Sequence, residues 1–148
     1  MSDPRAGLAP KSSDTAYADT NLFVALLVGS GHPLHDAAIG VFRRVADREL
    51  ALIVTPIVVA ELVYVARSLL RWTRKATSAR LGALLEAEGL VLIEGRTLKL
   101  ALQLYADLSK LDFADAYLAA AALEIGPPVV ASFDSDLDLV EGVRRITA

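Results

Sequence analysis

Short apolar runs alternate with stretches of helical periodicity along nearly the whole chain, and this alternation constrains the fold more than any other feature. Between successive apolar runs lie two helical stretches rather than one tight turn, so consecutive strands must be joined by crossover connections. Such connections make the strands parallel and place helices over the sheet. The alternation therefore predicts an α/β fold, a single-domain α/β/α sandwich with a central parallel sheet.

The same patterns place the individual elements. We expect strands at residues 16–19, 50–55, 90–93 and 129–132, with a further short strand near residues 145 and 146. Helices are expected at residues 21–28, 33 to about 48, 56 to about 70, 73–88, 97–109 and 112–125. Thr55-Pro56 is typical of a helix start, since threonine caps helices and proline fits their first turn.

The composition fits one globular domain without covalent crosslinks. The chain has 148 residues, of which 54% are hydrophobic and 22% charged, and a chain of this size can bury a sizeable core. Cysteine is absent, which excludes disulfides, a thiolate nucleophile and cysteine-ligated metal sites. Residues 1–15 are polar and contain proline, glycine and serine. We therefore expect a flexible leader there and the folded domain at residues 16–148.

Neither a secretory signal nor a membrane span is predicted. The longest apolar stretch, residues 50–66, contains Pro56 and Glu61 and is short for a bilayer. A strand followed by a helix explains this stretch better, so the expected compartment is the cytoplasm. The net charge of −3 also argues against a chain that binds nucleic acid through overall positive charge.

Four acids from distant segments are predicted to lie at one edge of the sheet. Asp19 closes the first predicted strand, and Glu61 lies in the second turn of the helix after the second strand. Asp115 lies in the first turn of the alanine-rich helix, and Asp134 follows the fourth strand. Because ligands of open parallel sheets bind beyond the carboxyl ends of the strands, these four positions define a candidate site.

Each acid also has a structural explanation that the sequence leaves open. Glu61 lies on an apolar helix with no basic residue three or four positions away, so it is either solvent-exposed or compensated by a bound cation. Asp115 could be a first-turn acid favoured by the helix dipole, behind Asp112 as the N-cap. Asp19 and Asp134 could be turn residues.

The donor set indicates which cation such a site would hold. Ligation by oxygen alone favours Mg²⁺ or Mn²⁺ over zinc. Four carboxylates would repel a phosphodiester, whereas one or two bound cations would make the cluster nearly neutral and able to activate water. The alternating aspartates at residues 134–138 do not begin an EF-hand, because its sixth position is Leu139 and its twelfth is Arg145.

Four segments resemble the motifs of a known family. They are YADTNLF at residues 17–23, TPIVVAEL at 55–62, DFADAYLAAA at 112–121 and VASFDSDL at 130–137. In order and approximate spacing they resemble the motifs of PIN-domain ribonucleases, from about residue 16 to the end of the chain. The compact length further resembles the VapC-type toxins of toxin–antitoxin systems.

The resemblance implies both a site and an activity. It implies four catalytic, metal-binding acids with Mg²⁺ or Mn²⁺ as cofactor: Asp19, Glu61, Asp115 and Asp134. Asn21 and Ser132 match positions that support such a site by hydrogen bonds, and Asp112 and Asp136 are extra acids for a second metal. The resemblance also implies an endoribonuclease that cuts single-stranded or looped RNA, a homodimer and a cognate antitoxin.

A basic segment could contact the RNA backbone. Between Leu62 and Leu85 there is no acid, and five basic residues fall there: Arg67, Arg71, Arg74, Lys75 and Arg80. If the preceding helix continued, the first three of these would share one face, and Trp72 could stack on a base. The alternative is a solvated face, with Trp72 packed at a helix junction or a dimer contact.

Two other functions are compatible with parts of this pattern. A catalytically silent PIN scaffold would bind RNA or protein without cutting it, although the intact set of acids argues against this. A Mg²⁺-dependent phosphatase would hydrolyse a small phosphomonoester, which the nuclease would not. The aspartates after the fourth predicted strand resemble such phosphatases, but too little chain follows for their later motifs.

Overall fold

The computed structural model describes residues 14–147, so most of the expected leader lies outside the described residues. The described chain divides into two compact units. Unit 1 comprises residues 14–71 and 83–93, and unit 2 comprises residues 72–82 and 94–147. Within this part of the chain, no helix combines the length and the apolar character that crossing a bilayer requires.

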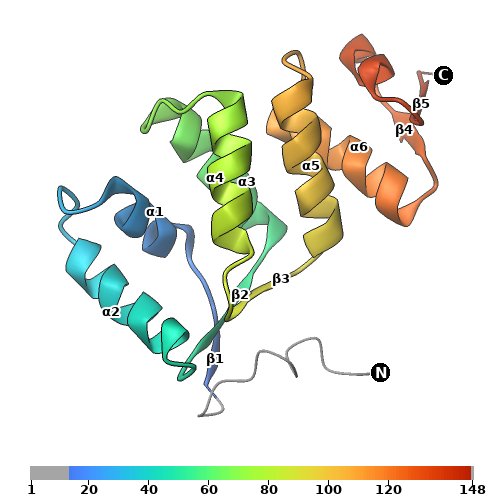
Figure 1. Cartoon of the computed structure of the whole chain (residues 1–148). Coiled ribbons are helices and arrows are strands. Elements are labelled where there is room, and N and C mark those ends of the chain that lie inside the picture. The colour runs from blue at the N-terminus through green and yellow to red at the C-terminus, as the bar shows by residue number, and fades with distance from the viewer. Residues whose placement is uncertain (1–13, 148) are drawn as a thin grey trace. The chain divides into compact units, whose positions relative to one another are not determined.

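Unit 1 is built around three parallel strands. Its elements are β1 (Thr15–Tyr17), α1 (Thr20–Val28), α2 (His35–Ala46), β2 (Ala51–Val54), α3 (Pro56–Ser68) and β3 (Leu90–Leu92). The strand order is β1-β2-β3, and Figure 1 shows these strands side by side. Helix α1 contacts both α2 and α3. The core of the unit includes Phe23, Val54, Val59 and Leu62, each at most 1% exposed.

Two sequence signals explain how helices and strands meet in this unit. Thr55 occupies the N-cap position of α3 and Pro56 its first turn, as predicted, although the Thr55 side chain makes no capping hydrogen bond. Gly89 precedes β3 with a φ of 90°, and a Cβ there would lie 2.5 Å from the Cγ1 of Val45 on α2. Glycine is therefore required at this turn both by its backbone conformation and by the close approach of α2.

Unit 2 pairs two helices with two short parallel strands. Its elements are α5 (Gly95–Asp107), α6 (Phe113–Ile125), β4 (Val129–Ala131), the short 3₁₀ helix η2 (Ser135–Leu139) and β5 (Arg144–Ile146). Helix α4 (Arg74–Leu85) begins in this unit and ends in unit 1. Val130 of β4 is in register with Arg145 of β5. A buried cluster joins α6, β4 and η2: Leu111, Ala119, Val130, Leu137 and Val140.

The predicted parallel α/β fold is confirmed, since every strand pair in residues 14–147 is parallel and the order of elements is the one expected. The described pairings form one sheet of three strands and one of two. The short strand expected near residues 145 and 146 is present as β5. Observed element ends differ from the predicted ones by at most three residues, with the largest difference at the end of α4.

The basic segment does not lie on one continuous helix, in agreement with the predicted break near residue 70. The helix that carries Arg67 does not continue to Arg74, because α3 ends at Ser68 and Arg71 has a φ of 56°. A left-handed residue interrupts helical hydrogen bonding. Arg67, Arg71 and Arg74 therefore do not share one face of a continuous helix.

Candidate metal site

The acids of unit 1 follow the carboxyl ends of adjacent strands. Asp19 comes two residues after β1, at the N-cap position of α1, but its side chain makes no capping hydrogen bond. Its carboxylate is exposed, as is Asn21 in the first turn of the helix. Glu61 lies on α3 between Ile57 and Tyr64, which are 71% and 72% exposed. Glu61 is itself exposed, and its role as a metal ligand stays a prediction.

The acids of unit 2 lie close together. Asp112 is the N-cap of α6, and its Oδ1 accepts a hydrogen bond from the Asp115 N–H at 2.8 Å. The pKa of Asp115 is raised from 3.8 to about 6, first by burial and then by the negative charges of Asp112 and Asp134. Asp134 comes from the segment after β4, so unit 2 brings acids from two distant segments into electrostatic contact.

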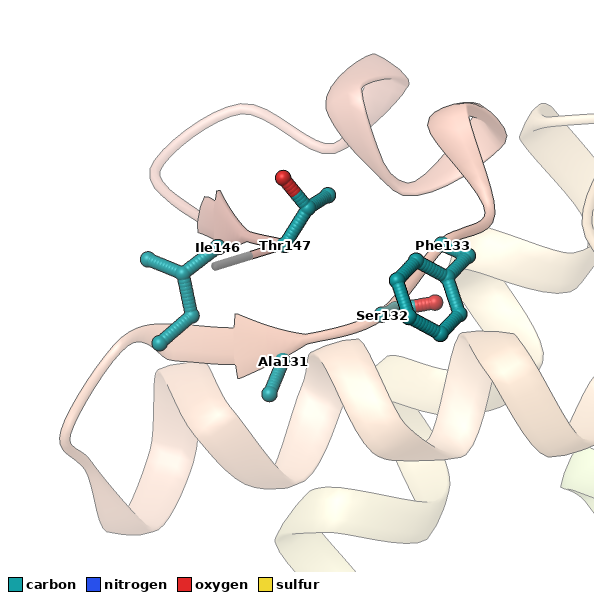
Figure 2. Close-up of a pocket in the computed structure, with 5 residues that line it drawn as sticks. All are labelled: Ala131, Ser132, Phe133, Ile146 and Thr147. Carbon is teal, nitrogen blue, oxygen red and sulfur yellow. The ribbon is translucent and has the colours of Figure 1, made fainter.

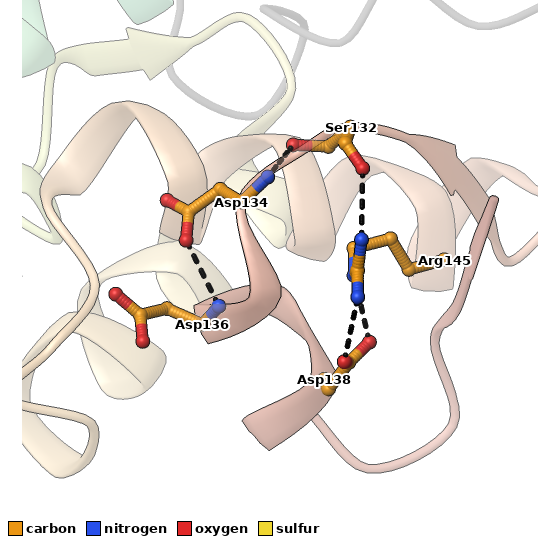
Figure 3. A network of polar contacts seen from close by, with 5 residues as sticks. All are labelled: Ser132, Asp134, Asp136, Asp138 and Arg145. Carbon is orange, nitrogen blue, oxygen red and sulfur yellow. Dashed lines mark hydrogen bonds and ion pairs between the residues drawn. The ribbon is translucent and has the colours of Figure 1, made fainter. Parts of the chain in front are cut away.

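Hydrogen bonds order the segment that carries Asp134 (Figure 3). The Ser132 hydroxyl accepts a hydrogen bond from the Asp134 N–H at 3.0 Å. One oxygen of Asp134, Oδ1, accepts from the Asp136 N–H at 2.9 Å. The Ser132 side chain therefore holds the backbone of Asp134. The Asp134 carboxylate in turn holds the backbone of Asp136 at the start of η2.

The donor set fits a hard divalent cation. The carboxylates of Asp112 and Asp134 disfavour the charged form of Asp115, and all the interactions that shift the pKa of Asp115 raise it. A bound cation would reverse this repulsion by favouring the ionised forms. The side chains that lie there, Asp112, Asp115 and Asp134, offer carboxylate oxygens, which suit Mg²⁺ or Mn²⁺ better than zinc.

The predicted set of four acids is divided between the two units. Asp19 and Glu61 belong to unit 1, whereas Asp115 and Asp134 belong to unit 2. Among residues 14–147, no group of three or more histidine, aspartate or glutamate side chains has the geometry to hold a metal ion. The complete four-acid site therefore stays a prediction.

Residues of the basic segment have different environments. The Arg74 guanidinium donates to the backbone carbonyls of Tyr105, Leu108 and Leu111 and lies 3.8 Å from the centre of the Tyr105 ring. Arg74 therefore ties the start of α4 to the end of α5 and the following loop. The Arg80 guanidinium lies 4.7 Å from the centre of the Trp72 ring, so one face of this indole is covered. Arg67, Arg71 and Lys75 are exposed.

Sequence reasoning missed two residues beside Asp134. Phe133 is 91% exposed, and Figure 2 shows it bordering an apolar hollow that Ala131 and Ile146 also line. Its position between Ser132 and Asp134, just past a predicted strand, was a usable signal for an exposed aromatic side chain. Arg145 contacts Ser132 and Asp138, but no sequence pattern indicates which residues a side chain on the last strand reaches.

The chain is similar to a known protein family in sequence and to a solved structure in fold. A family model described as "PIN domain" matches residues 16–143. The crystal structure of VapBC2 from Rickettsia felis bound to a DNA fragment from their promoter is similar at 18% sequence identity and a TM-score of 0.38. That similarity covers 89% of this chain and 97% of the other chain. Comparison with curated proteins gives no match.

Proposed function

The chain belongs to the PIN-domain family, and from this membership we propose that it is a metal-dependent endoribonuclease that hydrolyses RNA phosphodiester bonds. PIN domains are generally nucleases, and they usually use divalent metal ions. The observation that carries the proposal is the acid cluster of unit 2. There the pKa of Asp115 is raised to about 6 by burial and by neighbouring aspartates, an arrangement that a structural role for Asp115 does not require.

In the proposed mechanism the acids bind the cation and neighbouring side chains orient them. The ligands would be Asp19, Glu61, Asp115 and Asp134. Asp112 and Asp136 would contribute to a second metal, while Asn21 and Ser132 would hold the ligands by hydrogen bonds. When bound, Mg²⁺ or Mn²⁺ would supply Lewis-acid stabilisation of the phosphodiester charge and would activate water for attack. The two histidines, His32 and His35, lie outside the four motif segments. No side chain is therefore assigned as a general base.

Binding of RNA is assigned to exposed basic and aromatic side chains. Arg67, Arg71 and Lys75 would contact phosphates, which makes binding dependent on salt concentration. Phe133 would stack on an unpaired base next to Asp134, because an aromatic ring that is 91% exposed has a free face. Arg74 was part of the predicted basic set, but its guanidinium is engaged by three carbonyls, so its expected contribution is structural.

The proposed biological role is that of a toxin in a type II toxin–antitoxin pair. In this role the chain would be a cytoplasmic VapC-type homodimer, inhibited by a cognate antitoxin protein. The support is the compact PIN domain and the resemblance of its four motifs to those of VapC-type toxins.

Cleavage of total cellular RNA tests the activity. Wild-type protein with Mg²⁺ or Mn²⁺ should give discrete fragments, and these should disappear with EDTA or in Asp19→Asn. Asp107→Asn, at the exposed end of α5, is the matched control and should cut like wild type. If antitoxin-free wild type leaves diverse RNAs intact with either metal, the silent scaffold replaces the nuclease. Hydrolysis of a small phosphomonoester would instead indicate a phosphatase.

A further inference from the structure

Arg145 on β5 bonds Ser132, which precedes Asp134 in the chain, and Asp138, which follows it. We propose that Arg145 is a positioning residue for the Asp134 carboxylate. The inference rests on the proposed function, because Asp134 is one of the proposed metal ligands. All of the contacts that support it lie within unit 2.

The guanidinium of Arg145 makes three hydrogen bonds (Figure 3). Its Nε and Nη2 donate to the two carboxylate oxygens of Asp138 at 2.9 and 3.0 Å. Its Nη1 donates to the backbone carbonyl of Ser132 at 3.0 Å. A planar guanidinium paired with a carboxylate through two bonds has a fixed orientation. Arg145 therefore sets the separation between Ser132 and Asp138.

Asp134 lies between these two anchored residues. Ser132, held through its carbonyl by Arg145, presents its hydroxyl to the Asp134 N–H. Asp134 in turn accepts the Asp136 N–H, which fixes one of its carboxylate oxygens. A continuous series of hydrogen bonds thus runs from Arg145 to the proposed ligand. Loss of its first member is expected to loosen the members that follow.

A second anchor keeps the segment folded when the first is removed. Leu137 is fully buried and packs in the same cluster as Val130 and Val140. This apolar anchor holds η2 against β4 but does not hold the Ser132 hydroxyl or the Asp134 amide. Substitution of Arg145 is therefore expected to change the order of residues 132–136 more than the stability of the unit.

The geometry favours positioning over direct contact with RNA. The side chain of Arg145 is only 17% exposed, whereas that of Asp138 is 55% exposed. The Asp138 carboxylate and the Ser132 carbonyl already engage donors on all three guanidinium nitrogens. A phosphate would have to replace these partners, so the arginine is better suited to orient the segment than to bind substrate.

The test compares Arg145→Gln with Arg144→Gln, a matched control that removes the same charge from an exposed neighbour on β5. Amide hydrogen exchange in the metal-free proteins should be faster at Asp134 and Asp136 in Arg145→Gln alone. The affinity for Mn²⁺ should fall about tenfold, the usual scale for residues that orient metal ligands. RNA cleavage should fall with it, while the thermal midpoint stays near that of wild type.

A conservative variant separates geometry from charge. Lysine keeps the positive charge of Arg145 but cannot bond Asp138 through two nitrogens while donating to Ser132. Arg145→Lys should therefore resemble Arg145→Gln in hydrogen exchange and in Mn²⁺ affinity. Wild-type behaviour of Arg145→Lys would overturn the inference, because a charge alone would then suffice.

Two further outcomes would overturn the inference. One is unchanged exchange at Asp134 and Asp136 in Arg145→Gln, and the other is faster exchange with unchanged Mn²⁺ affinity. If Arg145→Gln fails to fold, Asp138→Asn breaks the same ion pair from its exposed side and must show the same local loosening. Failure of wild type to cut RNA would count against the proposed function alone, since exchange and Mn²⁺ affinity are measured without RNA.

Discussion

The acids of the two units are held in place by different means. In unit 2, Asp115 receives support from the Asp112 cap, and Asp134 is held through Ser132 and Asp136. In unit 1, Asp19 occupies a helix N-cap without a side-chain capping bond, and Glu61 projects from an exposed face of α3. Asp115 and Asp134 are therefore oriented before any cation binds. Asp19 and Glu61 have a fixed backbone but exposed side chains that can reorient.

This difference has an energetic consequence for metal binding. An exposed glutamate loses side-chain freedom when it becomes a ligand, which costs on the order of 1–2 kcal/mol. The pair in unit 2 has already lost much of that freedom on folding. Of the proposed ligands, the two in unit 2 are therefore expected to lose less side-chain freedom on binding a cation than the two in unit 1.

The largest expected effect comes from removing a proposed ligand in either unit. Glu61→Gln and Asp134→Asn should each lower RNA cleavage by at least about 100-fold, the upper range for residues that only orient ligands. Initial rates with Mg²⁺, beside the Asp107→Asn control, measure this. If Asp134→Asn is inactive and Glu61→Gln is fully active, Glu61 lies outside the site and Asp19 is the one proposed ligand left in unit 1.

A smaller effect is expected from the residues that support the ligands. Ser132→Ala removes the acceptor of the Asp134 N–H and should weaken Mn²⁺ binding about tenfold. Ser132→Thr keeps a hydroxyl and should bind nearly as well as wild type. Asn21→Ala, beside the less constrained Asp19, should change Mn²⁺ affinity less than Ser132→Ala does. The reverse order, measured by calorimetry, would contradict the assignment of unit 2 as the ordered half.

Substitution of Phe133 should lower the affinity for RNA by a factor similar to the roughly tenfold change in Mn²⁺ affinity expected for Ser132→Ala. Phe133→Ala removes an aromatic surface that is 91% exposed, and loss of one stacked base weakens binding about fivefold or more. Phe133→Trp should retain the affinity because it keeps a ring. Binding of single-stranded RNA is measured with Ca²⁺ or in Asp134→Asn, so that cleavage does not interfere. Equal affinity of the alanine and tryptophan variants would remove Phe133 from the RNA surface.

The smallest expected effect is on stability in the absence of metal. The pKa of Asp115 in the folded protein is about 6, above the value of 3.8 for the free side chain. Between these values the folded state holds a proton that the unfolded chain has released. The stability contributed by this group is therefore present below about pH 4 and is lost as the pH rises through 6. The side chain is partly exposed, and screening by solvent reduces the effect to about 1 kcal/mol.

Asp115→Asn removes this dependence. In EDTA the variant should be more stable than wild type at pH 7.5, and this advantage should shrink as the pH falls toward 4.5. Urea unfolding at the two pH values measures the difference, with Asp107→Asn as the control. A difference that does not change with pH would show that Asp115 titrates normally in the folded protein.

The fold could be predicted in large part because its signals are local. The Thr55-Pro56 start of α3, the Asp112 cap of α6 and the apolar strands can each be recognised within a few residues. The end of α3 was predicted to within about two residues, but the left-handed turn that follows it was not. Arg71 adopts a left-handed conformation that glycine or asparagine would have indicated, but arginine does not.

The candidate site could be predicted as a set of residues but not as a set of contacts. Asp115 and Asp134 were identified from their places after predicted elements, and the structure brings them within electrostatic reach of each other. The roles of Arg74 and Arg145 depend on carbonyls and carboxylates that only the tertiary structure presents. Spacing along the chain carries no information about such contacts. The sequence therefore suggested Arg74 as a contact for RNA phosphates, whereas in the structure its guanidinium donates to backbone carbonyls.

Titration of Mn²⁺ into wild type, Asp19→Asn and Asp115→Asn, followed by electron paramagnetic resonance, tests the central claim most directly. That claim is that acids from both units hold the cation. We predict that wild type binds Mn²⁺ and that both variants bind it at least about tenfold more weakly. Binding by Asp19→Asn with wild-type affinity, or no binding by wild type, would contradict the account.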